Sequence, residues 1–481
     1  MKKRIIAIVL VAIMALTLFV GCESYRFKAL SEVSDKNAVV ESNGGLAVKQ
    51  GNYVYFINAE SDYDYTESKE NYFNGKSNKL LGAIVRVKLD ENGIIVENSQ
   101  TVVVPKNVMT SYTGGGFYIY GEWIYYTSPS TASDASGSLK AYLDVLRTKT
   151  DGTKTQKLVT VKSQNFQYTV TPESFVYYDS TEKTLHYINT TVKRGFKDVV
   201  VDEKIASIVF PENTTYNPAS PNLYASAVFY TKNYEDDTKR VNQVYALDTA
   251  GKTYCVMEEN TWTSEPQKIE NIEKVFSITL KSAKQTEKGI ALYFRKQFYK
   301  GGSLTEGGLW SVEFDSSSTP FAVSGANNVP LNNKKLADAD ATTMYIIDAS
   351  SYYYLDGNVL KKVEAGKDEK EIIDFDHSIT FAFFYKSGEV EYIYYTKDSK
   401  LYRIAFSFDA NGDFVDPVTN EQTVLTSTSN ISTSWLKAEL VGNYYFYSNS
   451  SDKYTYAVDL TSFVNYDTES VKDFLVGKKI A

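Results

Sequence analysis

Short runs of consecutive apolar and aromatic residues recur along the chain, and each is followed by a polar loop and a second β-rich run. In residues 388–406, for example, the apolar run 392–395 precedes a polar loop and a second run at 400–404. Two β-rich runs joined by a loop of this length indicate one antiparallel hairpin. Eight such hairpins occur along the sequence.

The hairpins recur at a nearly constant spacing. The apolar triplets in their first strands have as middle residues Tyr55, Tyr125, Tyr177, Phe229, Tyr293, Tyr345, Tyr394 and Phe446. These positions are 70, 52, 52, 64, 52, 49 and 52 residues apart, and a strand-rich repeat near 50 residues is typical of a β-propeller. Triplets that are apolar at consecutive positions fit strands covered on both faces by neighbouring blades.

The sequence therefore predicts an all-β protein, a single propeller of eight four-stranded antiparallel blades. Seven blades are the alternative, with Phe446 starting an extra ribbon. Residues 37–41 are a candidate strand for closing the ring against the last blade, and residues 45–50 are the predicted innermost strand of blade one. The one modest candidate for a helix is residues 468–475.

The N-terminus has the layout of a signal peptide. Three basic residues precede an uncharged stretch of 16 residues at 5–20, which is short of the roughly 20 residues that a membrane-spanning helix needs. The stretch ends at Gly21 and Cys22, and a small residue before a cysteine at this place resembles a bacterial lipobox. The resemblance implies cleavage before Cys22 and attachment of lipid to its thiol and new amine. An uncleaved anchor is the alternative.

Either reading leaves the protein tethered outside the cytoplasm. The predicted organisation is a lipoprotein signal peptide at residues 1–21, a tether at 22–36 and the propeller at 37–481. The predicted location is the cell membrane, with a lipid anchor and an outward-facing body.

The charge of the chain argues against a nucleic-acid partner. The net charge of −8 becomes −11 when Lys2, Lys3 and Arg4 are removed with the signal peptide, and no basic block remains. An acidic chain of this kind is a poor match for a phosphate backbone.

Residues suited to catalysis are few. His186 and His377 each lack a second histidine at metal-ligand spacing, and no nucleophile elbow occurs. Acidic pairs such as Asp236 and Asp237 could supply paired carboxylates, although most such pairs are solvated surface. Cys255 is expected to lie on a strand as a small apolar side chain. We therefore predict no catalytic residue, no metal and no cofactor.

Glycine and aspartate clusters are interpreted as turns. The three glycines at 114–116 precede a strand, so they offer no helix N-terminus to a phosphate. Residues 409–413 suggest a calcium loop but lack its later ligands. Residues 90–93 occupy the same place in blade one, so tight turns explain both segments.

Three of the first strands carry a recognisable pattern: WIYYT at 123–127, VFYT at 228–231 and IYYT at 393–396. With the second strands that follow, the repeat resembles bacterial lipoprotein propellers and, through them, the YWTD propellers of the LDL-receptor family. Tyrosine replaces the tryptophan of that motif, and its aspartate is missing after Thr127, Thr231 and Thr396. The resemblance implies a non-catalytic binding module, and we predict a monomer that binds an unknown protein, peptide or glycan. A carboxylate-based hydrolase or lyase acting on a cell-envelope glycan in the central channel is the alternative.

The hairpin loops of all blades are expected on one face of the ring, because each joins the second and third strands of its blade. The loops of blades one, four and five are the longest and carry the predicted binding residues: Tyr63, Tyr65, Tyr72, Phe73, Tyr234, Phe298 and Tyr299. Aromatic rings on long loops are typical of recognition surfaces. The alternative is that these rings pack their own loops onto the blade edges.

Overall fold

The computed structural model contains 34 β-strands among the residues that it describes. These residues are 29–58, 82–108, 116–130, 132, 134–137, 140, 142–162, 166–212, 214–221, 228–235, 240–262, 274–287, 289–300, 303–315, 334–337, 344–375, 378–387, 390–410, 414–415, 421–429, 431, 438–452, 454–461 and 473–477.

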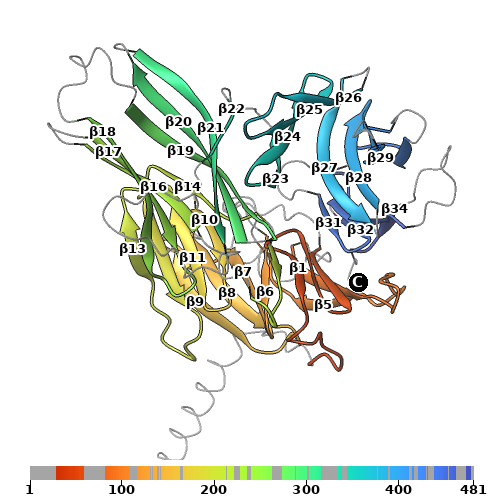
Figure 1. Cartoon of the computed structure of the whole chain (residues 1–481). Helices are drawn as coiled ribbons and strands as arrows, with labels where there is room; N and C mark the ends of the chain where they lie inside the picture. Colours follow the sequence, from red (N-terminus) through yellow and green to blue (C-terminus); the bar gives the residue numbers. More distant parts are fainter. Residues whose placement is uncertain are drawn as a thin grey trace, which may run out of the picture.

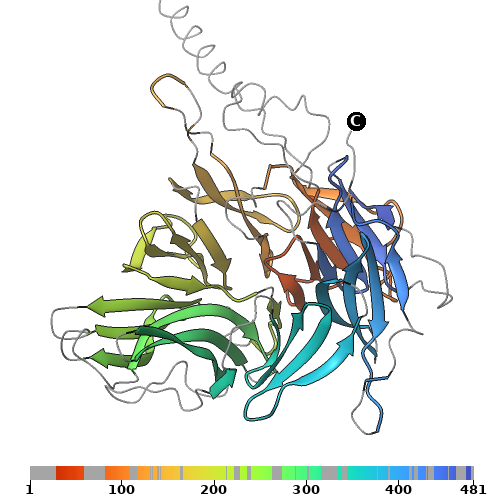
Figure 2. The same cartoon turned by 90° about the horizontal axis from the view of Figure 1, so that it is seen from above.

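The strands form eight antiparallel sheets, which are the blades of a propeller (Figures 1 and 2). Blade one contains β2 (Ala47–Gln50), β3 (Tyr53–Ile57), β4 (Ile84–Lys88) and β5 (Thr101–Val104). Blade two contains β6 (Tyr118–Tyr120), β7 (Trp123–Pro129), β8 (Leu143–Lys149) and β9 (Thr155–Val161). Blade three contains β10 (Phe166–Val170), β11 (Ser174–Asp179), β12 (Thr184–Asn189) and β13 (Val199–Glu203). Blade four contains β14 (Ser207–Val209), β16 (Val228–Glu235), β17 (Arg240–Leu247) and β18 (Thr253–Trp262).

The C-terminal half continues the same pattern. Blade five contains β19 (Lys274–Gln285), β20 (Gly289–Lys300), β21 (Ser303–Asp315) and β22 (Lys334–Ala337). Blade six contains β23 (Met344–Asp348), β24 (Ser351–Asp356), β25 (Val359–Glu364) and β26 (Lys370–Asp374). Blade seven contains β27 (Thr380–Ser387), β28 (Val390–Lys397), β29 (Lys400–Ala405) and β30 (Gln422–Leu425). Blade eight contains β31 (Glu439–Val441), β32 (Tyr444–Ser448), β33 (Thr455–Asp459) and β34 (Asp473–Leu475).

Buried apolar clusters join every blade to the next and close the ring. One cluster spans blades eight, one and two, and in it the rings of Phe56 and Phe446 lie 5.9 Å apart. Further clusters join blades two and three, three and four, four and five, five and six, six and seven, and seven and eight. The prediction of an all-β, eight-bladed propeller is confirmed. The seven-blade alternative is wrong, because Phe446 belongs to the second strand of a complete blade.

The apolar triplets mark the second strand of a blade, with one exception. The second strand of blade one, β3, is buried along its whole length because blades cover it on both sides. In blade six, however, the triplet around Tyr345 lies in the innermost strand, and the second strand is β24 with Tyr352 and Tyr353. The first and second strands of this blade both carry tyrosine-rich apolar runs, so the spacing of the triplets alone identified the wrong strand as the second.

Two additional strands lie inside blade one, toward the middle of the ring. β1 (Val40–Asn43) pairs with β2, and β15 (Thr214–Tyr216) pairs with β1 on its other side. β15 belongs to the connection between β14 and β16, so a segment of blade four reaches blade one. The crossing segment also contacts blade five, since Pro211 forms a bridge with Ala283.

β1 does not close the ring in the way that the sequence predicts for residues 37–41. Blade eight has four strands of its own, and β1 pairs with β2 and β15 instead. Its contact with blade eight runs through side chains, since Ser42 Oγ donates a hydrogen bond to the carbonyl of Leu440 over 3.0 Å. The predicted helix at 468–475 is wrong for its described end, because residues 473–475 form β34.

Candidate functional site

The antiparallel order of each blade defines two faces of the ring. Loops between second and third strands lie on one face, which we call the hairpin face. The turns that join the first strand to the second and the third strand to the fourth lie on the opposite face, which we call the turn face. On the turn face, Gly51, Gly121 and Gly442 occupy equivalent turns with φ of 59°, 59° and 57°, a left-handed conformation that glycine adopts without a steric cost.

Three of the predicted binding residues lie on strands near the hairpin face. Phe298 and Tyr299 belong to β20, opposite Thr305 and Leu304 of β21, and Tyr234 belongs to β16. The prediction that these three residues are on loops is wrong, because the strands of blades four and five extend almost to the hairpin tips. Tyr63, Tyr65, Tyr72 and Phe73 lie outside the described residues.

The hairpin of blade five forms an arm that extends beyond the other blades (Figure 1). Its strands β20 and β21 have 12 and 13 residues. Phe298 is half-buried and packs against the cluster shared by blades four and five. A side chain added at Gly307 would meet the Phe298 ring at 2.0 Å, so Gly307 leaves room for this ring on the arm.

A second group of polar side chains gathers near the ring axis on the turn face. Lys284 interacts with Glu212 and Glu391, and Tyr345 interacts with Glu212. With Tyr385 of β27, which interacts with Glu41, these residues form the axial cluster. Lys284 at the end of β19 donates a hydrogen bond to the carbonyl of Ile346 in β23. Burial lowers the pKa of Lys284, and the nearby carboxylates of Glu212 and Glu391 partly oppose this effect.

The tyrosines of the axial cluster are held in their neutral form. Burial raises the pKa of Tyr345, with a smaller contribution from Glu212. Burial also raises the pKa of Tyr385 to about 12, with a smaller contribution from Glu41. The cluster can therefore offer phenol hydroxyls and an ammonium group beside exposed carboxylates, which suits recognition of a polar ligand.

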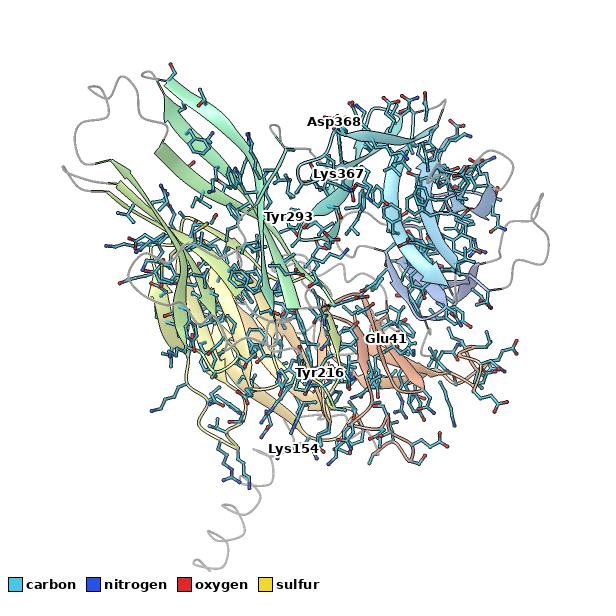
Figure 3. All side chains as sticks on the ribbon, viewed as in Figure 1. Glu41, Lys154, Tyr216, Tyr293, Lys367 and Asp368 are labelled. Carbon is cyan, nitrogen blue, oxygen red and sulfur yellow. The ribbon has the colours of Figure 1, made fainter. Side chains whose placement is uncertain are left out.

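The axial cluster continues onto β1 and β15. Glu41 pairs with Lys49 over 2.6 Å. Tyr216 lies beside Glu41's strand, as Figure 3 shows, and its ring meets that of Tyr120 edge-on at 4.9 Å. Sequence reasoning missed all of these residues, because they come from six blades and share no motif or spacing.

His186 belongs to a hydrogen-bonded relay in blade three. Its Nδ1 lies 2.9 Å from Oδ1 of Asp198, and its Nε2 lies 2.9 Å from Oγ1 of Thr184. The ring stacks on Tyr177 at 4.3 Å, and Tyr177 donates to the same carboxylate. All polar atoms of the histidine are thus engaged within the blade. Among the described residues, no group of three or more metal-ligating side chains is placed to hold an ion.

Cys255 lies on β18, as the sequence predicts, and is half-buried. Burial raises the pKa of its thiol to about 11, and Glu258 adds to this effect. Because the thiolate is the reactive form, the raised pKa predicts that Cys255 reacts slowly.

We expect Cys255 to react slowly with a thiol reagent. In a Cys22→Ala variant, which leaves Cys255 as the sole cysteine, the labelling rate at pH 8 should lie on the order of a hundredfold below that of free cysteine. The rate should rise steeply only as the pH approaches about 11. Denatured protein is the control and should react at the rate of free cysteine. Rapid labelling of the native protein would contradict the burial of this thiol.

Cys22 lies outside the described residues. No helix in the described part of the chain is long and apolar enough to cross a membrane. The first described residues lie on the turn face, where the Leu30 amide donates to the carbonyl of Asp151 over 3.1 Å. Glu32 then accepts hydrogen bonds from Tyr53 and Lys88, so the described part of the predicted tether lies against blades one and two.

No known family model and no curated sequence matches the chain. Among solved structures it is similar in fold to a nidogen/laminin complex component, a propeller of the YWTD type, at 9% identity over 70% of this chain and 89% of that chain, with a TM-score of 0.24. It is also similar to apo AztD from Citrobacter koseri, at 11% identity over 81% and 92% of the two chains, with a TM-score of 0.36. A third similar structure is the polysaccharide lyase Uly1, at 11% identity over 76% and 93%, with a TM-score of 0.33. These proteins differ in role, and the matches assign no activity to this chain.

Proposed function

We propose that the protein is a membrane-anchored, outward-facing propeller that binds a protein, peptide or glycan without catalysing a reaction. The observation that carries this proposal is the place where the chain enters the folded body. Leu30 joins the body on the turn face, beside Asp151. An anchor at Cys22 therefore holds the turn face toward the membrane and directs the hairpin face, with the arm of blade five, away from it.

The arm is suited to recognition in two respects. Its paired strands β20 and β21 hold the backbone in place along their length, so little conformational entropy is lost on binding. Phe298 and Tyr299 lie three residues or fewer from its tip, where aromatic rings supply contact area with few torsions to restrict.

The axial cluster favours a second candidate, a hydrolase or lyase. Glu212 and Glu391 are exposed carboxylates beside Lys284, whose lowered pKa is a property of some catalytic bases. In this candidate, a cell-envelope glycan would bind on the turn face rather than on the hairpin face.

The proposal is tested by a Phe298→Ala/Tyr299→Ala variant, compared with wild type in membrane pull-downs and on cell-wall glycan fragments. We expect the affinity for a bound partner to fall at least about tenfold in this variant, because aromatic side chains at an interface commonly contribute about 1–2 kcal/mol or more to the binding free energy. The melting temperature should fall modestly, because Phe298 is half-buried against the cluster shared by blades four and five, and a Glu212→Gln/Glu391→Gln variant should bind as wild type does. Retained binding with a lowered melting temperature would show that the rings only pack the arm. Glycan turnover that Glu212→Gln/Glu391→Gln abolishes would establish the second candidate instead.

A further inference from the structure

The turn face of blades two and three carries a basic patch on this otherwise acidic protein. The patch consists of Lys154, Lys193, Arg194 and Lys197, all of which are exposed. None of the four forms an ion pair with a carboxylate in the described part of the chain, and the nearby Glu122 and Asp198 are engaged by Lys149 and His186. Val192 and Val199, exposed by 37% and 47%, flank the patch with apolar surface.

The loop that presents three of these charges, residues 190–198, is fixed to blade two. Arg147 donates hydrogen bonds to the carbonyls of Thr190 and Val192 over 2.6 and 3.4 Å. The guanidinium carbon of Arg147 lies 4.3 Å from the ring centre of Trp123 and 5.0 Å from that of Phe196. Arg147 thus engages the backbone, while Lys193, Arg194 and Lys197 remain directed to solvent.

The anchored end of the chain meets the body next to this patch. Leu30 is bonded to Asp151, which lies between Lys149 and Lys154 in the turn from β8 to β9. Eight residue steps separate Cys22 from Leu30, and these can span at most about 28 Å. A lipid on Cys22 would therefore keep the basic patch close to the bilayer.

We propose that the basic patch docks on an anionic lipid surface and so sets the orientation of the ring. This inference rests on the membrane anchoring in the proposed function. Lysine and arginine side chains near an anionic bilayer are attracted to it, and salt screens the attraction. The valines add apolar contact at the level of the headgroups. Because blade one carries acidic residues in its own turn, Asp90, Glu91 and Glu97, the ring tilts so that blade three approaches the membrane.

The test uses the full chain reconstituted into phosphatidylcholine vesicles with or without phosphatidylglycerol. An amine reagent labels exposed lysines, and mass spectrometry measures the labelling rate at each site. We expect Lys193 and Lys197 to react at least about fivefold more slowly in the anionic vesicles. High salt should abolish this protection. Lys367 and Lys370, across the ring on blade six, are the internal controls and should react equally in both lipids; Figure 3 shows Lys367 far from Lys154.

A charge-reversal variant separates docking from folding. Lys154→Glu/Arg194→Glu should restore the labelling of Lys193 and Lys197 in anionic vesicles, whereas Lys367→Glu/Lys400→Glu, with the same charge change elsewhere, should leave the protection intact. Equal labelling of Lys193 in both lipids, with the protein present in the vesicle pellet, would overturn the docking proposal. Absence of the protein from the pellet would overturn the anchor itself, so the two failures are distinguishable.

Discussion

Replacing Gly116 by alanine should destabilise the ring by about 3 kcal/mol or more. An added Cβ would lie 1.8 Å from the carbonyl oxygen of Gly45 and 2.8 Å from that of Gly44. Both are backbone atoms of the turn between β1 and β2, so neither can rotate away. The same contact carries three hydrogen bonds: Gly116 to Gly44 over 2.9 Å, Phe117 to Gly45 over 3.3 Å, and Gly44 to Phe117 over 3.0 Å.

Urea denaturation of the wild type and of Gly116→Ala measures this loss of stability, and Gly137→Ala is the control. Gly137 has a φ of +86°, and nothing lies within 4 Å of its added Cβ. Its replacement should cost only about 1 kcal/mol, for the left-handed backbone. A smaller loss for Gly116→Ala than for Gly137→Ala would mean that blades one and two tolerate separation at this point.

The fold was predictable because burial in a propeller leaves a local pattern in the sequence. A second strand is covered on both faces, so it must be apolar at consecutive positions, as Val54, Tyr55 and Phe56 are. The pattern failed in blade six, where the innermost strand around Tyr345 has the same character as the second strand around Tyr353. Periodicity identifies buried strands, but it does not assign their order within a blade.

Strands made by long-range pairing were not predictable. β15 has three residues, and the connection from β14 to β16 that contains it has three prolines and several polar residues, as loops do. Only the partner β1, more than 170 residues earlier, makes it a strand. The three glycines at 114–116 were excluded as a phosphate site. The structure shows that position 116 requires a glycine because the backbone of Gly44 and Gly45 lies against it. The sequence gives no sign of this contact.

The axial cluster was hidden for the same reason. Lys284, Tyr345 and Glu391 lie on three different blades, and only the closed ring brings them together. On the hairpin face, the aromatic residues of blade five were recognised, but they were assigned to a loop instead of a strand. Aromatic and β-branched runs favour strands, so the extension of β20 to Lys300 follows the local sequence more closely than the predicted loop did.

Glu439 should make the protein less stable as the pH rises from about 5 to about 8. Its buried carboxyl lies in the seam between blades eight and one, where it accepts a hydrogen bond from the Ala47 amide over 3.2 Å. Gly45 leaves the necessary space, since a Cβ there would lie 1.9 Å from the carboxyl oxygen. Burial raises the pKa of Glu439 from 4.5 to about 8, an effect that hydrogen bonds from Ala47 and Leu46 oppose.

The sign follows from proton binding. Between pH 4.5 and about 8 the folded protein holds a proton on Glu439 that the unfolded chain has lost, so a rise in pH favours unfolding. The difference between the two pKa values sets an upper bound of about 5 kcal/mol on this loss. Glu439→Gln keeps the shape of a neutral carboxyl and should remove the loss, so the variant should be more stable than wild type at pH 9 and similar to it at pH 5.

Glu364→Gln is the matched control, because the ammonium groups of Lys367 and Lys362 lower the pKa of the partly exposed Glu364. Its contribution to stability is present above pH 4.5 and disappears as the pH falls through the lowered value, the opposite sense to Glu439. Denaturation midpoints measured from pH 4 to pH 9 should therefore diverge from wild type at high pH for Glu439→Gln. For Glu364→Gln, the difference from wild type should change only at the acid end. Parallel curves for wild type and Glu439→Gln would mean that the seam holds this carboxylate charged, with a partner that compensates its burial.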